Sequence, residues 1–179
     1  YGTDLSFGVK LDKQYDRSKV VVKYNGTVIE PKGGVYTIPG VKNNIGIADT
    51  DPKITVEGVE LNRYYITLPL ETETGFTIVV GEGLNAKSVL SGTDFNFKFF
   101  LDPAYSDSTP VIKYSADGGN TYNVITPNED GNYFIKNVLS DCIVVVEGVK
   151  KNTYTVKFLD EDGTVLDEHK DVEYGAEVN

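Results

Sequence analysis

The chain has 179 residues, a formal net charge of −10 and a sequence pI of about 4.5, and 40% of its residues are hydrophobic. This length allows one domain or two small ones with a core of their own. The acidic balance and the lack of a basic stripe argue against nucleic-acid partners and anionic membrane surfaces, and no apolar run is long enough to insert into a membrane.

Short runs rich in Val, Ile, Tyr, Phe and Thr, bounded by Gly, Asn, Asp and Pro, predict strands along the whole chain. Helical periodicity with capping residues is absent. The strands are expected at 5–11, 19–24, 27–30, 35–38, 53–59, 64–68, 75–81, 95–101, 110–114, 122–126, 132–135, 142–149, 153–159 and 164–172. Many short strands separated by Gly-containing turns predict an all-β sandwich or barrel.

Several of these segments alternate apolar and polar residues. Phe95, Phe97 and Phe99 alternate with polar positions, and Tyr154 and Phe158 share the apolar side of a later strand. One apolar and one polar face per strand is typical of antiparallel sheets. We therefore expect both apolar faces to be buried.

The second half of the chain repeats the first at an offset of 90 residues. Segment 11–15 returns as 101–105, because Leu-Asp-x-x-Tyr occurs at both places. The same offset relates three further pairs of segments, namely 2–4 with 92–94, 21–24 with 111–114, and 56–59 with 146–149. Self-similarity at a fixed period predicts a tandem array of similar modules.

The offset widens to 96 and 97 between Val28 and Val41, and it returns to 90 at Val56. The second repeat has therefore gained residues at 116–121, and the first at 44–52. Surface loops accept such insertions at small entropic cost. We expect both insertions to be extended hairpin tips.

The repeat suggests a domain organisation. We assign 1–62 to a first β repeat, 63–152 to a second, and 153–179 to the start of a third β module. Two alternatives stay open. Residues 63–90 could complete the first repeat, or the modules could begin at Gly2 and Gly92, which gives two near-complete units.

A longer signature accompanies the repeat, namely G-T-D-F-x-F, L-D-x-x-Y, V-x-K-Y, G-x-Y-x-I-x-x-V and V-x-V-E-G-V-x-x-N-x-Y, carried here by residues 92–154. It resembles tandem modules of Gram-positive bacterial cell-surface proteins. The tail, at 154–163 and 172–175, is similar to the start of a Listeria–Bacteroides-type repeat. The resemblance implies tandem small antiparallel β-sandwich (immunoglobulin-like) repeats in a secreted or cell-wall-associated bacterial protein. It carries over no catalytic residues.

Chemistry-bearing residues are few. His169 is the only histidine and lies in a polar stretch, and Cys142 is the only cysteine and lies in an apolar strand, where we expect a buried structural thiol. The acidic runs at 49–51 and 160–162 are typical of turns, with calcium binding as the weaker alternative. We predict no enzyme, no catalytic or metal residues and no cofactor.

Tyrosines are the residues with binding potential, since aromatic rings offer rigid stacking surface. Tyr15 and Tyr105 occupy equivalent places after Leu-Asp, and Tyr122 lies in a variable loop. Each is either a ligand contact or part of a core. The sequence favours a structural stalk that supports adhesion, whose partners are the neighbouring repeats. The alternative is a module that binds carbohydrate or a host protein.

Overall fold

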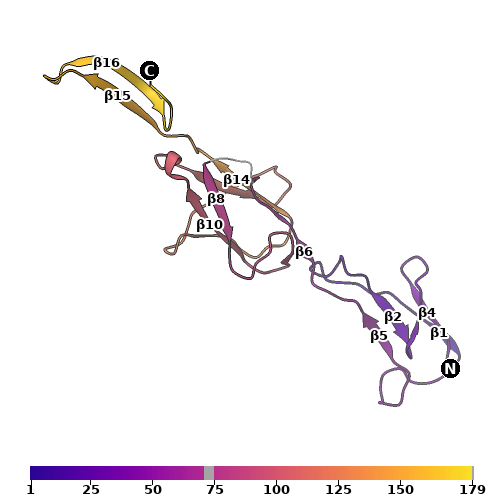
Figure 1. The fold of residues 1–179 in the computed structure, drawn as a ribbon. Coiled ribbons are helices and arrows are strands. Elements are labelled where there is room, and N and C mark those ends of the chain that lie inside the picture. Colours follow the sequence, from indigo (N-terminus) through magenta and orange to yellow (C-terminus); the bar gives the residue numbers. More distant parts are fainter. Residues whose placement is uncertain (71–74, 179) are drawn as a thin grey trace. The chain divides into compact units, whose positions relative to one another are not determined.

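A computed structural model describes residues 1–70 and 75–178 of the chain (Figure 1). The chain forms two compact units, Tyr1–Arg63 and Tyr64–Asn179. Strands make up nearly all regular structure in the described residues, with one short 3-10 helix, η1 (Pro103–Tyr105). The predicted all-β fold class is confirmed. No helix in these residues has the length and hydrophobicity to cross a membrane.

The first unit contains two small antiparallel sheets. Its strands are β1 (Thr3–Phe7), β2 (Val21–Tyr24), β3 (Thr27–Val28), β4 (Tyr36–Val41) and β5 (Ile54–Glu57). Strand β1 pairs with β4, while β2 lies between β3 and β5. Val22 from one sheet and Tyr36 and Ile38 from the other are its buried apolar side chains.

The second unit has two larger sheets. Its strands are β6 (Arg63–Tyr64), β7 (Ile66–Thr67), β8 (Phe76–Val80), β9 (Val89–Leu90), β10 (Phe95–Leu101), β11 (Val111–Ser115), β12 (Asn123–Ile125), β13 (Asn132–Ile135) and β14 (Cys142–Glu147). One sheet has the order β13-β10-β8, and the other has the order β12-β11-β14-β7. The pair of β7 with β14 is parallel, whereas the other pairs in these two sheets are antiparallel.

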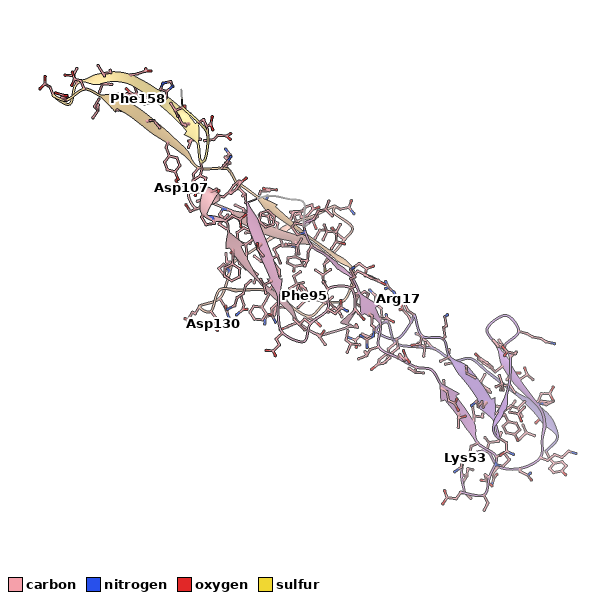
Figure 2. The ribbon with its side chains drawn as sticks, viewed as in Figure 1. Arg17, Lys53, Phe95, Asp107, Asp130 and Phe158 are labelled. Atoms are coloured by element: carbon pink, nitrogen blue, oxygen red, sulfur yellow. The ribbon has the colours of Figure 1, made fainter. Side chains whose placement is uncertain are left out.

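Both sheets of the second unit contribute to a single core. Phe95 and Phe97 of β10 are fully buried, and Ile112 and Val144 of the opposite sheet belong to the same apolar cluster. Figure 2 shows Phe95 among the side chains inside this unit. The predicted apolar face of segment 95–101 is confirmed. Two sheets that share one core form an arrangement consistent with a small β-sandwich.

Strand pairing in the two units follows the sequence repeat. Val22 pairs with Val56 in the first unit, and Ile112 pairs with Val146 in the second, so that both partners are 90 residues further on. The other sheets correspond as well, since Phe7 pairs with Tyr36 and Phe97 pairs with Tyr133. Equivalent residues thus hold equivalent register positions.

The two insertions differ in structure. Residues 116–122 join β11 to β12, which pair with each other, so the predicted hairpin tip is confirmed there. Residues 42–53 join β4 to β5, and β4 pairs with β1 while β5 pairs with β2. The prediction of a hairpin tip at 44–52 is therefore wrong, because this loop connects two sheets.

The segment 63–90 pairs with the second unit. Strand β7 extends one sheet beside β14, and β8 extends the other beside β10. At the two ends of this segment, β6 and β9 pair with each other, a strand pair that the sequence did not predict. This segment therefore covers both sheets of the second unit and does not complete the first.

The chain continues into a hairpin of β15 (Thr153–Leu159) and β16 (Val165–Glu173). Its two strands pair with each other, and Tyr154 and Phe158 remain 46% and 43% exposed. The apolar face predicted to be buried on this strand is therefore open. Figure 2 marks Phe158 on the hairpin.

Candidate functional site

The most extensively bonded buried polar groups are two asparagines at equivalent positions, Asn62 and Asn152. Each is only 4% exposed, although each lies next to exposed residues. A buried amide costs free energy unless its donors and acceptors are paired. We call each asparagine with its hydrogen-bonding partners an asparagine clamp.

The clamp at Asn152 ties the chain after β14 to the turn around η1. Its Oδ1 accepts a hydrogen bond from the backbone N–H of Asp107 (3.1 Å), and its backbone N–H donates to the carbonyl of Ala104 (2.7 Å). Its Nδ2 lies within hydrogen-bonding distance of three oxygens, namely the carbonyl of Pro103 (3.3 Å), Oγ of Ser106 (3.0 Å) and Oη of Tyr154 (3.2 Å). Figure 2 labels Asp107 in this turn.

The clamp at Asn62 uses the corresponding backbone of the first unit. Its Oδ1 accepts from the N–H of Arg17 (3.2 Å), and its backbone N–H donates to the carbonyl of Gln14 (2.7 Å). Its Nδ2 donates to the carbonyl of Lys13 and to Oδ1 of Asp16, both at 2.9 Å. Each clamp fixes the exit of one strand against the turn that follows β1 or β10.

A serine strengthens each clamp. Oγ of Ser18 donates to the carbonyl of Glu60 and accepts from its N–H, both at 2.9 Å. Ser108 repeats the arrangement with Lys150, at 2.8 and 2.9 Å. A hydroxyl can donate and accept at once, so one side chain satisfies both backbone groups of the opposite residue.

Glycine permits the close approach that each clamp needs. Gly58 and Gly148 have φ of +75° and +78°, and a Cβ atom there would lie 2.4 Å from the carbonyl oxygen of Lys19 or 2.6 Å from that of Thr109. A side chain at either position would combine a disfavoured φ with a collision against backbone.

We expect Gly148→Ala to lower the free energy of unfolding of the second unit by about 2 kcal/mol, because it adds both penalties. The matched control is Gly131→Ala, which has the same φ of +78° and open space around the added Cβ. Gly131→Ala should lower the free energy of unfolding by about 1 kcal/mol, because only the disfavoured φ contributes there. Chemical denaturation of the two variants measures the difference, and equal losses would contradict the role of the close approach.

The predicted ligand-contact tyrosines lie on separate parts of the chain. Tyr15 and Tyr105 are half-buried in equivalent turns, where their backbone N–H groups donate to the carbonyls of Asp12 (2.8 Å) and Asp102 (2.9 Å). The Tyr105 ring lies against the backbone of Gly75, since a Cβ there would come within 2.7 Å of it. Tyr122 is 42% exposed. Tyr105 therefore packs within its unit, and Tyr122 is the most accessible of the three.

Tyr122 follows a loop organised by Asp117. The carboxylate accepts hydrogen bonds from Oγ1 of Thr121 (2.6 Å), from the N–H of Thr121 (3.0 Å) and from Oγ of Ser115 (2.7 Å). These donors, with the Thr121 hydroxyl first, lower the pKa of Asp117 from 3.8 to about 2. Hydrogen bonds to a carboxylate favour its ionised form.

The loop should therefore be pH-dependent in a defined direction. Because the folded pKa of Asp117 is lowered, the stabilisation by its carboxylate is complete above pH 3.8 and is lost as the pH falls towards 2. NMR titration of the carboxyl carbon should give a midpoint near 2, and Thr121→Val should move it towards 3.8. A wild-type midpoint near 3.8 would contradict this account.

The acidic runs considered for calcium form turns. Oδ1 of Asp160 accepts from the N–H groups of Asp162 (3.0 Å) and Thr164 (2.8 Å), and Oδ2 of Asp51 accepts from that of Ala48 (2.8 Å). Residues 1–70 and 75–178 contain no group of three or more His, Cys, Asp or Glu side chains placed to hold a metal ion. These carboxylates act on their own backbone in this structure.

His169 and Cys142, the single histidine and the single cysteine of the sequence, each contact a residue two positions away. His169 Nε2 lies 2.9 Å from Oδ2 of Asp167, and its ring meets the edge of Phe158. Cys142 is buried, as predicted, and burial raises the pKa of its thiol, so the neutral form is favoured.

Three surface grooves lie near the residues described above. The one beside Leu68, Phe76 and Ile78 has a volume of about 450 Å³ and is lined mainly by apolar groups. Those bordering the Asn62 and Asn152 clamps measure about 470 and 320 Å³. Comparisons with protein-family models, with curated proteins and with solved structures found no match. Function must therefore be argued from the residues themselves.

The sequence repeat contains a signal for the clamps. Asn62 and Asn152 both stand four residues after the glycine of Val-Glu-Gly-Val, and both are followed two residues later by tyrosine. A polar residue repeated at one position, at the end of a strand, is a candidate for a buried hydrogen-bonding role. The repeat located these asparagines, but only the structure shows their burial.

Proposed function

We propose that this chain is a structural stalk segment of a secreted or wall-anchored bacterial surface protein that supports adhesion. The observation that carries the proposal is the direct succession of the two units, since the first ends at Arg63 and the second starts at Tyr64. Both units keep the same strand register and the same clamp, while their loops differ. Selection for a repeated scaffold, rather than for one convergent site, accounts for this pattern.

In this proposal, the segment acts through the length that its folded units provide. A row of folded units gains length in proportion to their number, whereas a flexible linker gains only with its square root. The clamps support this role, because they immobilise the residues at which the chain leaves each set of strands. The partners of this segment would then be neighbouring repeats of the same chain.

The stalk proposal can be tested by measuring how much the distance between the two units varies. Spin labels at exposed positions of each unit, Asn44→Cys and Glu129→Cys in a Cys142→Ala background, allow electron–electron distance measurement. We expect a narrow distance distribution, which a flexible six-residue insertion between Asn62 and Arg63, ahead of β6, should broaden. A wild-type distribution as broad as that of the insertion variant would sink the proposal.

A second candidate function is binding of carbohydrate or a host protein at the 116–122 loop. Tyr122 favours it, because an exposed aromatic ring on a loop ordered by Asp117 offers a pre-organised stacking surface. Glycan-array and matrix-protein binding by the chain, lost in Tyr122→Ala and kept in Tyr65→Ala, which removes another exposed tyrosine, would support it. Equal binding by both variants would argue against this loop.

A further inference from the structure

The two units have equivalent strands but differ at two sheet edges. In the second unit, β10 has β8 beside it and β14 has β7 beside it. In the first unit, the equivalent strands β1 and β5 each have a neighbour on one side only among the described residues, namely β4 and β2. An edge strand leaves a row of backbone donors and acceptors without strand partners.

Apolar side chains beside these edges are open as well. Leu5 on β1 is 38% exposed, whereas its equivalent Phe95 is fully buried. Val56 on β5 is 41% exposed, whereas its equivalent Val146 is half-buried against the core. The first unit thus presents an apolar face at the very positions that are covered in the second.

The second unit shows what covers such a face. Tyr64, Ile66 and Val89 are buried in its core, and Ile78 and Val80 pack against it. All five come from the single segment 64–90, which gives one strand to each sheet. This one segment therefore completes both sheets and closes the core between them.

The lengths of β1 and β10 indicate that the first unit lacks a counterpart of β8. In β10, residues 97–101 pair with β8, and the strand continues to Leu101. The equivalent strand β1 ends at Phe7, and residues 8–11, which correspond to 98–101, form no strand. The first unit lacks regular structure where the second unit depends on β8.

We propose that the open face of the first unit is a docking site for an extended polypeptide segment with the apolar pattern of 64–90. The repeat supports this kind of segment, because Gly2-Thr3-Asp4 corresponds to Gly92-Thr93-Asp94, and in the second unit that motif follows the segment that completes both sheets. The segment would add one strand parallel to β5 and one antiparallel to β1, as in the second unit. A second copy pairing through one edge would extend only one sheet and leave the core open.

The test adds a copy of residues 63–90 immediately before Tyr1 of the full chain. Hydrogen exchange of the β1 and β5 amides should slow by about tenfold or more, because their edges become paired. The Leu5 side chain should also become protected from solvent. The matched control is the same extension with I66D and I78D in the copied segment, which places charges where apolar side chains would be buried.

Three results would overturn the proposal. Unchanged exchange at β1 and β5 in the extended chain would show that the segment does not dock there. Equal protection by the wild-type and doubly substituted extensions would show that the apolar pattern is irrelevant. Protection that grows with concentration in the unextended chain would identify a second copy as the occupant.

Discussion

Phe95→Ala should lower the free energy of unfolding of the second unit by about 4 kcal/mol, because the ring is fully buried between two sheets and its removal leaves a cavity. The equivalent change in the first unit, Leu5→Ala, should cost only about 1 kcal/mol, since Leu5 is already 38% exposed. One repeat position thus gives two very different effects; part of the difference reflects the larger ring of Phe95, and the rest reports the cover supplied by segment 64–90.

Denaturation followed by residue-resolved probes in each unit separates these two losses. Phe100→Ala is the matched control on the same strand, because Phe100 is 52% exposed and points away from the core. It should change stability by less than about 1 kcal/mol. Similar losses for Phe95→Ala and Leu5→Ala would mean that the core of the first unit is closed in solution.

Asn152→Ala should destabilise the second unit by about 3 to 4 kcal/mol. The change removes the acceptor for the N–H of Asp107 and the donors to Pro103 and Ser106, which are partly buried hydrogen bonds of a residue that is only 4% exposed. Each buried polar group that is left without a hydrogen-bonding partner lowers the free energy of unfolding by about 1 to 3 kcal/mol. Asn62→Ala should act in the same way on the first unit.

The comparison variant is Asn123→Ala, on the exposed strand β12, which should change the free energy of unfolding by less than about 0.5 kcal/mol. Amide exchange at Asp107 adds a local readout, because loss of the clamp should speed exchange there before the whole unit unfolds. If Asn152→Ala were as mild as Asn123→Ala, the clamp would contribute nothing to stability.

Much of the strand pattern could be predicted from the sequence. The segments at 95–101, 132–135 and 153–159 match observed strands, because alternation and bounding turns are local properties. Strand partners depend on distant contacts, which is why the loop at 44–52 was wrongly expected to be a hairpin tip. The open face of β15 also differs from its pattern, since alternation states which side is apolar but not what covers it.

The candidate site was less predictable than the strands. Tyrosine chemistry favours ligand contact, but Tyr15 and Tyr105 are half-buried because of the turns in which they lie, and the sequence repeat does not reveal the structure of those turns. Asn62 and Asn152 are ordinary polar residues in sequence. Their role depends on backbone groups some 45 residues earlier in the chain, such as the N–H of Asp107, which the fold brings to them.

The parallel pairing of β7 with β14 has a mechanical consequence. The chain enters β7 close to the start of the second unit and leaves β14 ahead of the hairpin of β15 and β16, and Cys142 and Ile143 pair with Ile66 and Thr67. Tension between these two points pulls the strands lengthwise past each other. Their hydrogen bonds are then loaded together in shear instead of opening one by one, so this strand pair should resist stretching.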